Sequence, residues 1–513
     1  MDFYDELSEI GLEYVLERPV YKSIKMENSD TVYNAINDIL KTNAKVLVYG
    51  DYDTDGLMCI KVWEEFFNLI GFTNYKTYRY SERMHTLDPK AVREALEEKY
   101  EYMVISDTAS SEICEGGLIH RLLKFGVKPV VIDHHQTIYE YKDYPKDCAI
   151  VNNTIENRMY PEREEIRLSA GALCFVVLDY YLSQYYPKVD TNLLSAYALI
   201  SLYADSIDMS GTINRAIYYK ATQLSRRELP SSVSLFMTPN SKFGRRFIEF
   251  QYTPRINCVF RNEMFPLLNS YVSLKNNKDI PKMVKRVDML TSLHLDLVKV
   301  IGQVADIIEY EVLDNFILAN LNSVNNFIDI ETYKLYNYTG LVANRLAERF
   351  GKPAVVWCMW DGEIKGSFRD LLSRSYLKTF QQFCVAGGHD PAFGFHLQPL
   401  EFENFLRFIK RIDKKFYIEG EPNRPIVIDH RDREPDESLL NDIALYNEFG
   451  GNKIPITLVK KAYTADIKEK ASKYGGYTYR WDKYFINSSH RYKYGDYILF
   501  KPTIEKSLRL YGV

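Results

Sequence analysis

The chain lacks the features that mark a secreted, membrane-spanning or zinc-stabilised protein. Its seven cysteines are scattered, odd in number and without a CxxC pair, which argues against a disulfide framework and a structural zinc site. The amino terminus is acidic and has no apolar segment of the kind found in secretory signals. No run reaches the roughly 18 apolar residues that a membrane-spanning helix needs. We therefore expect a cytoplasmic protein without a membrane partner.

The chain also has no excess of positive charge. Its formal net charge is -4, so a polyanionic partner would have to be met by a local groove or by metal ions that offset carboxylates. A content of 46% hydrophobic and 26% charged residues is ordinary for a globular protein, and 513 residues suggest two to four domains. The 41 tyrosines fit base stacking and ordinary packing equally well.

The first third of the chain alternates short apolar runs with helical segments. Residues 45–50 (KVLVYG), 102–107 (YMVISD) and 128–135 (KPVVIDHH) have the pattern of buried strands. Their alternation with helices predicts a doubly wound α/β fold with a parallel sheet. Functional groups of such sheets collect at the carboxyl ends of the strands. The Asp and His residues of these segments fall at those ends.

Three further regions follow. Between Pro281 and Asn315 apolar residues recur at helical spacing with almost no Gly or Pro, which predicts a long connecting helix. A smaller α/β pattern begins near Tyr338 and ends at the glycine-rich segment 387–395 (GGHDPAFGF). Residues 413–513 contain short β-like pieces that could form a small barrel.

The most specific motif is GDYDTDG (50–56), directly after the first strand. Its carboxylates Asp51, Asp53 and Asp55 stand at alternate positions and repel one another, a cost that a divalent cation relieves most simply. An aspartate-rich surface turn and a calcium loop are the alternatives. An EF-hand loop counted from Asp51 would place Val62, and not the required Glu, at its twelfth position. A loop counted from Asp53 would place Glu64 there, but the flanking strand argues against it.

Further oxygen and imidazole ligands follow the other strands. Asp107 ends one strand, and the triplet 133–135 (Asp-His-His) ends the next. A lone buried His is usually a core residue, but an adjacent pair after a strand favours metal or phosphate contact. Asp205 could equally cap a helix. Without thiolates, such a ligand set suits manganese or magnesium and supports a metal-activated water attacking a phosphoryl centre.

These motifs carry a resemblance to a known family. GDYDTDG, the Asp of VISDTAS, VVIDHH and LYADSID occur in the order of the four motifs of the DHH phosphoesterase superfamily. TPRINCVFR (253–261) looks like a segment of RecJ-type exonucleases, and the resemblance extends over about residues 45–460. The resemblance implies a DHH catalytic domain (45–280), a connecting helix (281–335), a smaller α/β DHH-associated substrate-binding domain (336–412) and the start of an OB-like nucleic-acid-binding β-barrel (413–513). Residues 1–44, which carry little of it, are expected to form an N-terminal helical extension.

The resemblance also implies a shared site for two ions, Mn²⁺ or Mg²⁺. His135 would contact the scissile phosphate, and Asp51 and Asp133 would orient the ligands, so these three are the expected catalytic residues. The metal ligands would be Asp53, Asp107 and Asp205 for one ion, and Asp55, Asp107, His134 and Asp205 for the other.

One position departs from the family. Many relatives have a His immediately before the Gly-Asp of the first motif, where this chain has Tyr49. A neutral phenol is a poor metal ligand, so one tightly held ion is an alternative to two.

Substrate-binding residues are implied in the same way. Ser367 and Arg369 resemble phosphate contacts, because Arg offers a planar fork to phosphate oxygens. A plain turn remains the alternative for the glycine pair, and a surface salt bridge for Arg369. The full expected set is Arg83, Arg255, Asn257, Arg261, Ser367, Arg369, Gly387, Gly388 and His389.

The sequence thus predicts a metal-dependent 5′→3′ exonuclease that cuts single-stranded DNA to mononucleotides, in recombination, repair or replication. RNA as a substrate and replication or recombination proteins as partners stay open, and the resemblance favours a monomer. One alternative is a phosphodiesterase for short oligonucleotides or cyclic dinucleotides, although such relatives are usually shorter. Another is a non-catalytic replication scaffold, although such relatives often lose motif residues that this chain keeps.

Overall fold

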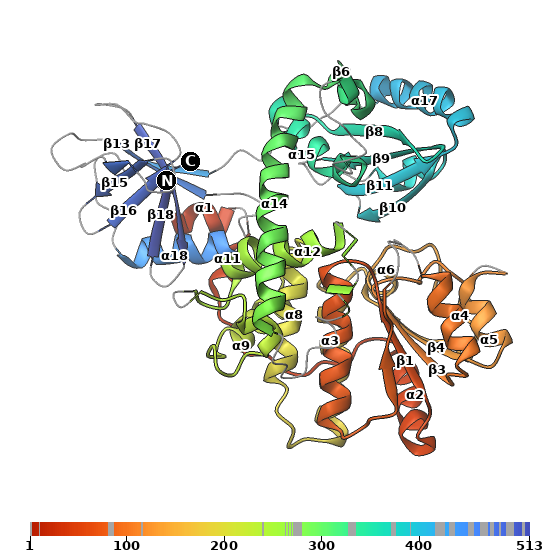
Figure 1. Cartoon of the computed structure of the whole chain (residues 1–513). Coiled ribbons are helices and arrows are strands. Elements are labelled where there is room, and N and C mark those ends of the chain that lie inside the picture. Colours follow the sequence, from red (N-terminus) through yellow and green to blue (C-terminus); the bar gives the residue numbers. More distant parts are fainter. Residues whose placement is uncertain are drawn as a thin grey trace. The chain divides into compact units, whose positions relative to one another are not determined.

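A computed structural model describes most of the chain, which divides into two compact units (Figure 1). Unit 1 combines Met1–Val284 with Asn423–Val513, and unit 2 comprises Lys285–Pro422. The described residues are 3–9, 11–80, 87–113, 116–238, 241–261, 263–264, 266–267, 269, 280–326, 335–370, 376–389, 391–415, 426–429, 437–449, 456–461, 470–471, 477–481, 484–488, 497–504 and 508–512.

Unit 1 contains the predicted parallel sheet. Its five strands have the order β2-β1-β3-β4-β5, and every neighbouring pair is parallel. All residues of β1 and β3 are buried, as expected of strands covered by helices on both faces. The expectation of a parallel α/β domain is therefore confirmed. The strands are β1 (Val46–Gly50), β2 (Tyr75–Thr77), β3 (Tyr102–Ser106), β4 (Lys128–Asp133) and β5 (Ala149–Asn152).

Helices cover both faces of this sheet. In Figure 1, α4 and α5 lie on one side of it and α3 on the other. Helices α3, α7 and α8 pack against one another, and α7 and α8 are buried nearly all round. The helices of this part are α1 (Phe3–Glu9), α2 (Ser29–Thr42), α3 (Thr54–Leu69), α4 (Pro89–Glu97), α5 (Leu118–Lys124), α6 (Asn153–Met159), α7 (Ala170–Tyr185), α8 (Asn192–Ala204), α9 (Thr212–Ala221), α10 (Ser231–Ser234), α11 (Arg245–Phe247) and α12 (Thr253–Arg261).

The connecting helix is shorter than the sequence pattern predicts. Helix α14 (Ile280–Ile307) ends at Ile307, and two short strands follow where helix was expected. These strands pair with each other, and β7 also pairs in parallel with β8, so both join the sheet of unit 2. Tertiary pairing has overridden the helical periodicity at this point.

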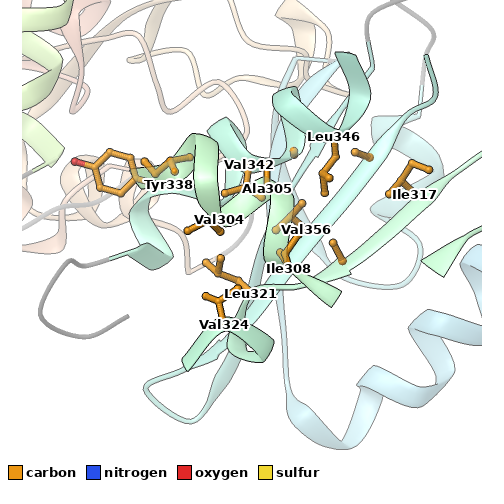
Figure 2. Close-up of a cluster of buried hydrophobic side chains, with 14 of the residues drawn as sticks. Val304, Ala305, Ile308, Ile317, Leu321, Val324, Tyr338, Val342, Leu346 and Val356 are labelled. Atoms are coloured by element: carbon orange, nitrogen blue, oxygen red, sulfur yellow. The ribbon is translucent and has the colours of Figure 1, made fainter. Parts of the chain in front are cut away.

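Unit 2 is a six-stranded mixed sheet with the order β10-β11-β9-β8-β7-β6. One face packs on α15 and the last turns of α14; Figure 2 shows Val342 and Leu346 beside Val304 and Val356. Phenylalanines of α17 cover the other face. The elements are β6 (Glu309–Val312), β7 (Ile317–Asn320), α15 (Thr339–Phe350), β8 (Ala354–Trp360), β9 (Glu363–Arg369), α16 (Leu377–Phe380), β10 (Val385–His389), β11 (Ala392–Leu397) and α17 (Phe402–Lys415).

The C-terminal part of unit 1 is a helix and a seven-stranded mixed sheet. The strand order is β12-β13-β17-β18-β16-β15-β14. Strands are present where the β-like pieces predicted them, while the OB-like barrel stays a prediction. Among the described residues, no helix is both long and apolar enough to cross a membrane. The elements are β12 (Ile426–Asp429), α18 (Glu437–Phe449), β13 (Ile456–Lys461), β14 (Lys470–Ala471), β15 (Tyr477–Trp481), β16 (Tyr484–Ser488), β17 (Tyr497–Ile504) and β18 (Leu508–Gly512).

Candidate metal centre

Two glycines shape the turn that carries the first three aspartates. A Cβ on Gly50 would lie 2.1 Å from the carbonyl oxygen of Gly56, and one on Gly56 would lie 2.2 Å from that of Asp51. Only residues without a side chain allow the backbone to close so tightly. Asp53 then caps α3 by accepting from the amide of Gly56 at 3.1 Å.

The remaining ligands reach the same place from other elements. Asp107 follows β3 directly with a left-handed φ of 65°, which turns the chain out of the sheet. His134 and His135 follow β4, and Asp205 caps the C-terminal end of α8. Parallel strands bring their carboxyl ends to one edge of a sheet, so residues far apart in sequence meet there.

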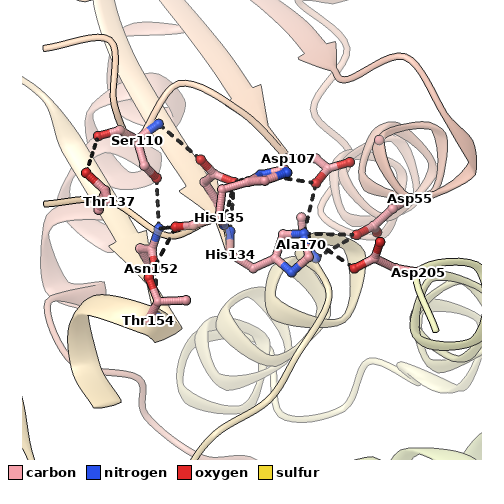
Figure 3. Close-up of polar contacts among 12 residues, drawn as sticks. Asp55, Asp107, Ser110, His134, His135, Thr137, Asn152, Thr154, Ala170 and Asp205 are labelled. Atoms are coloured by element: carbon pink, nitrogen blue, oxygen red, sulfur yellow. Dashed lines mark hydrogen bonds and ion pairs between the residues drawn. The ribbon is translucent and has the colours of Figure 1, made fainter. Parts of the chain in front are cut away.

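The ring of His134 is at the centre of the cluster (Figure 3). Its Nδ1 lies 3.1 Å from the carbonyl oxygen of Leu168, which can only accept, so the proton sits on Nδ1. The lone pair with which the ring could bind a metal is then on Nε2. This Nε2 lies 3.2 Å from Asp107 Oδ1, 3.7 Å from Asp55 Oδ2 and 3.6 Å from Asp205 Oδ2.

Two donor groups share His134. Asp55, His134 and Asp205 form one, and Asp107, His134 and His135 form the other, with ligand atoms in each group within 4.8 Å of one another. Oxygen and imidazole donors at this spacing suit a Mn²⁺ or Mg²⁺ ion in the first group. In the second group Asp107 and His134 can bind an ion, whereas His135 cannot while its imidazole is protonated. The arrangement fits one ion or two ions that share ligands.

Asp55 is held in place by a dedicated set of donors. Its two oxygens accept from the amides of Ala170 and Gly171 at the start of α7, each at 2.9 Å, and from the hydroxyl of Ser201. A Cβ on Gly171 would lie 2.7 Å from Ser201 Oγ, so the glycine lets α7 approach. These donors fix the carboxylate in one orientation before any ion arrives.

Asp133 plays a different part, because its carboxylate is already saturated. One oxygen accepts from the amides of His134 at 2.8 Å and His135 at 3.2 Å, and the other accepts from the amide of Ser110 at 3.0 Å. Asp133 Oδ1 also lies 2.8 Å from His135 Nδ1. Burial alone would raise the pKa of Asp133, but the positive histidine beside it holds that pKa well below its usual range.

His135 is the cationic group of the site. Burial lowers the pKa of its imidazole, but the charge and hydrogen bond of Asp133 outweigh burial and raise it to about 10. Its side chain is 32% exposed, whereas that of His134 is 3% exposed. A charged imidazole that reaches solvent beside a cluster of acids can donate to an incoming phosphate.

The acids themselves need a cation. Burial and neighbouring carboxylates raise the pKa of Asp51, Asp53 and Asp107, and burial and the charge of Asp205 raise that of Asp55 to about 7. The Oδ1 atom of Asp51 is buried and has no hydrogen-bond partner within the described part of the chain. A buried carboxylate oxygen of this kind is costly unless it meets a positive charge. The donor set therefore fits a divalent metal.

Tyr49 belongs to the core and to neither donor group. It is fully buried, and its ring contacts those of Tyr78 at 5.5 Å and Tyr80 at 6.4 Å. The hydroxyl of Tyr80 donates to the carbonyl of Gly50 at 2.8 Å, and this hydrogen bond fixes the start of the GDYDTDG motif. An aromatic cluster thus surrounds Tyr49, immediately before the first motif.

The substrate residues expected in unit 1 lie mainly on α12. Asn257 accepts from the hydroxyl of Thr54 at 2.7 Å, which ties α12 to the start of α3. Arg255 donates to the carbonyl of Gln251 at 2.6 Å, and Arg261 is partly exposed. Arg83 lies outside the described residues.

Ser367, Arg369 and Gly387 of the expected set lie on one face of the sheet of unit 2. In the antiparallel register, Gly387 of β10 pairs with Gly394 of β11, and Gly394 pairs with Ser367 of β9. The backbone of His389 is aligned in the same way, across β11, with Arg369. Gly388 lies between Gly387 and His389 on β10 and has a left-handed φ of 132°. A Cβ on Gly387 would meet nothing within 4 Å, so the fold itself does not require glycine there.

Sequence reasoning missed several residues that complete these sites. Thr339, at the start of α15, shares a hydrogen bond of 2.9 Å with Ser367. Asn152 ends β5 and donates to Ser110 at 2.8 Å and to the carbonyl of His135 at 3.0 Å. Its place at a strand end is a signal that could have found it. Ser201 has no such signal, because it lies within an apolar helix.

Three kinds of comparison relate the chain to known proteins. No family model matches it. Single-stranded-DNA-specific exonuclease RecJ of Bacillus subtilis is 21% identical over 390 residues, which cover 74% of this chain and 47% of that protein. YorK of the SPbeta prophage in the same organism, named as a putative single-strand DNA-specific exonuclease, is 24% identical over 424 residues, covering 76% of this chain and 69% of that protein. The chain thus spans about half the length of the curated RecJ that it matches.

Solved structures of RecJ also resemble this chain. RecJ of Thermus thermophilus in complex with Mn²⁺ superimposes with a TM-score of 0.72 at 17% identity, covering 97% of this chain and 72% of that one. The Mg²⁺ complex of the same protein gives a TM-score of 0.66 at 15% identity, covering 99% and 73%. The chain therefore has the fold of these RecJ structures.

Proposed function

We propose that the chain is a metal-dependent exonuclease that hydrolyses single-stranded DNA from the 5′ end to mononucleotides. The observation that carries this proposal is the convergence of Asp55, Asp107 and Asp205 on the lone pair of His134 Nε2. The RecJ fold and the exonuclease names of the relatives support it.

In this proposal, the residues of the site have separate roles in binding the metal and binding the substrate. Asp55, Asp107, His134 and Asp205 would hold Mn²⁺ or Mg²⁺, with Asp53 and Asp51 facing the same charge. When bound, such an ion offsets charge on the phosphoryl group and activates water for attack. His135, charged through Asp133, would donate to a phosphate oxygen and bind the scissile phosphate. Ser367 and Arg369 would bind a further phosphate of the strand.

The alternatives have less support. A non-catalytic scaffold would not need Asp55 held in one orientation by three donors. It would also not need a buried cluster of charged groups, which costs stability. A phosphodiesterase for dinucleotides would not need the C-terminal sheet that follows α18.

Digestion of end-labelled substrates tests the proposal. Single-stranded DNA, duplex DNA, RNA and dinucleotides are incubated with Mn²⁺ or Mg²⁺. We expect release of labelled mononucleotide from the 5′ end of single strands and no cutting of blunt duplex. Release from 3′ ends alone would overturn the polarity, and cleavage of dinucleotides alone would favour the small-substrate enzyme.

A further inference from the structure

Helix α8 presents two opposite faces to the rest of unit 1. Ser201 and Asp205 are four residues apart and therefore share one face. Ser201 donates to Asp55, and Asp205 lies 3.6 Å from His134 Nε2, so this face belongs to the metal centre. Tyr203, midway between them, points to the other face.

The end of α8 that carries Asp205 is a strained turn. Asp205 is the capping residue, and Ser206 after it has a left-handed φ of 55°, which costs free energy for any residue with a side chain. The turn is closed by the amide of Ser206 on the carbonyl of Tyr203 at 3.3 Å, and by the amide of Ile207 on that of Leu202 at 2.9 Å. A strained helix end keeps one conformation only where its surroundings hold it.

Helix α18 provides that support from the other face. The hydroxyl of Tyr203 donates to Glu448 Oε1 at 2.7 Å, and Tyr203 is 5% and Glu448 8% exposed. The guanidinium of Arg245 donates to the carbonyl of Glu448 at 3.1 Å and lies 5.9 Å from the ring centroid of Tyr203. Phe449 packs edge-on against Tyr218 of α9 at 4.9 Å. The end of α18 is therefore fixed by a hydrogen bond, a cation and an aromatic contact.

We infer that Glu448 is a positioning residue of the metal centre, which acts through Tyr203 to hold Asp205 in its ligand geometry. The inference rests on the proposed function, because it assumes that Asp205 binds the ion. It gives the C-terminal region a role besides any contact with nucleic acid. Without α18, the catalytic part of unit 1 would lack one support of its ligand set.

Binding of Mn²⁺ to the metal-free full chain, without nucleic acid, separates positioning from mere stability. Tyr203→Phe removes only the hydroxyl, and we expect Mn²⁺ affinity to fall about tenfold, the lower end of the effect of groups that orient ligands. Glu448→Leu should do the same, whereas Glu448→Gln keeps an acceptor oxygen and should stay within about threefold of wild type. Affinity is followed by the electron paramagnetic resonance signal of free Mn²⁺.

Tyr181→Phe is the matched control. Tyr181 is 1% exposed, lies late in α7, and donates to Asn37 at 2.7 Å, away from the ligands. It should lose a comparable amount of thermal stability and bind Mn²⁺ as wild type does. Unchanged Mn²⁺ affinity in both Tyr203→Phe and Glu448→Leu would overturn the inference and leave the proposed function standing. A wild-type chain that binds no Mn²⁺ would instead overturn the proposed function.

Discussion

The cluster of acids and histidines in unit 1 is largely buried and assembled from four separate elements, whereas Ser367 and Arg369 of unit 2 are partly exposed and lie on a single strand, β9. In the cluster, ligands are oriented by partners, such as Leu168 for His134. In unit 2, Arg369 donates to the carbonyl of its neighbour Phe368 at 2.7 Å. Under the proposed function, the first region would hold a small ion in fixed geometry, and the second would meet a larger anion from solvent.

Because of this difference, substitutions in the two regions should impair different steps of the proposed reaction. Damage to the cluster should abolish the chemistry, since a metal site works only when all its ligands are in place. Damage to the face should weaken strand binding and leave ion binding intact, because the two regions share no described ligand. The following experiments test that separation.

The largest effect is expected from His134→Ala. Loss of the central ligand should lower turnover of single-stranded DNA at least about 1,000-fold, because an ion supplies several kcal/mol of charge stabilisation. Mn²⁺ binding should be lost as well. His120→Ala, at an exposed position of α5, is the control. Turnover within tenfold of wild type would rule out His134 as a ligand.

Acid should weaken ion binding by about 100-fold between pH 7 and pH 5. The pKa of Asp55 is raised to about 7 from 3.8, so a proton competes with the metal below pH 7, by about tenfold per pH unit. In the metal-free protein, the contribution of Asp55 to stability should fall as pH rises from about 4 to about 7, because a raised carboxyl pKa favours the protonated folded state. Mn²⁺ should therefore raise the melting temperature more at pH 8 than at pH 5. An equal shift at both values contradicts this.

Arg369→Ala should raise KM for single-stranded DNA by about 30-fold, from the loss of about 2 kcal/mol in a charged hydrogen bond. Mn²⁺ affinity should not change. Lys365→Ala is the matched control, since Lys365 is a partly exposed cation earlier on the same face of β9. Equal effects of the two variants would show a general charge effect in place of a specific contact.

The smallest effect is expected from Gly387→Ala. The methyl group enters open space, so the melting temperature should stay as in wild type. If a strand approaches the backbone here, KM should rise about threefold through loss of one close contact. An unchanged KM would leave Gly387 with no role in substrate binding.

The sequence was enough to bring Asp107 and His134 to one edge of the sheet, because their positions follow from local patterns. An acid or histidine that ends a buried strand must lie at the edge of the sheet, and Asp107 and His134 could be placed there from pattern alone. The amides of Ala170 and Gly171 could not, because backbone donors leave no mark in residue type. The end of α14 at Ile307 was also hidden, since the strands that follow it belong to a sheet whose next strand, β8, comes much later in the chain.

The chain order of the two units also affects how the protein is made. Helix α18 packs on α8 and α9, but it is synthesised after all of unit 2, which lies between them in sequence. Unit 2 contributes its own core and can fold as it emerges, whereas unit 1 must wait for α18 to complete its last contacts. Because such long loops slow folding, the region around Asp205 completes its contacts with α18 only after unit 2 has been made.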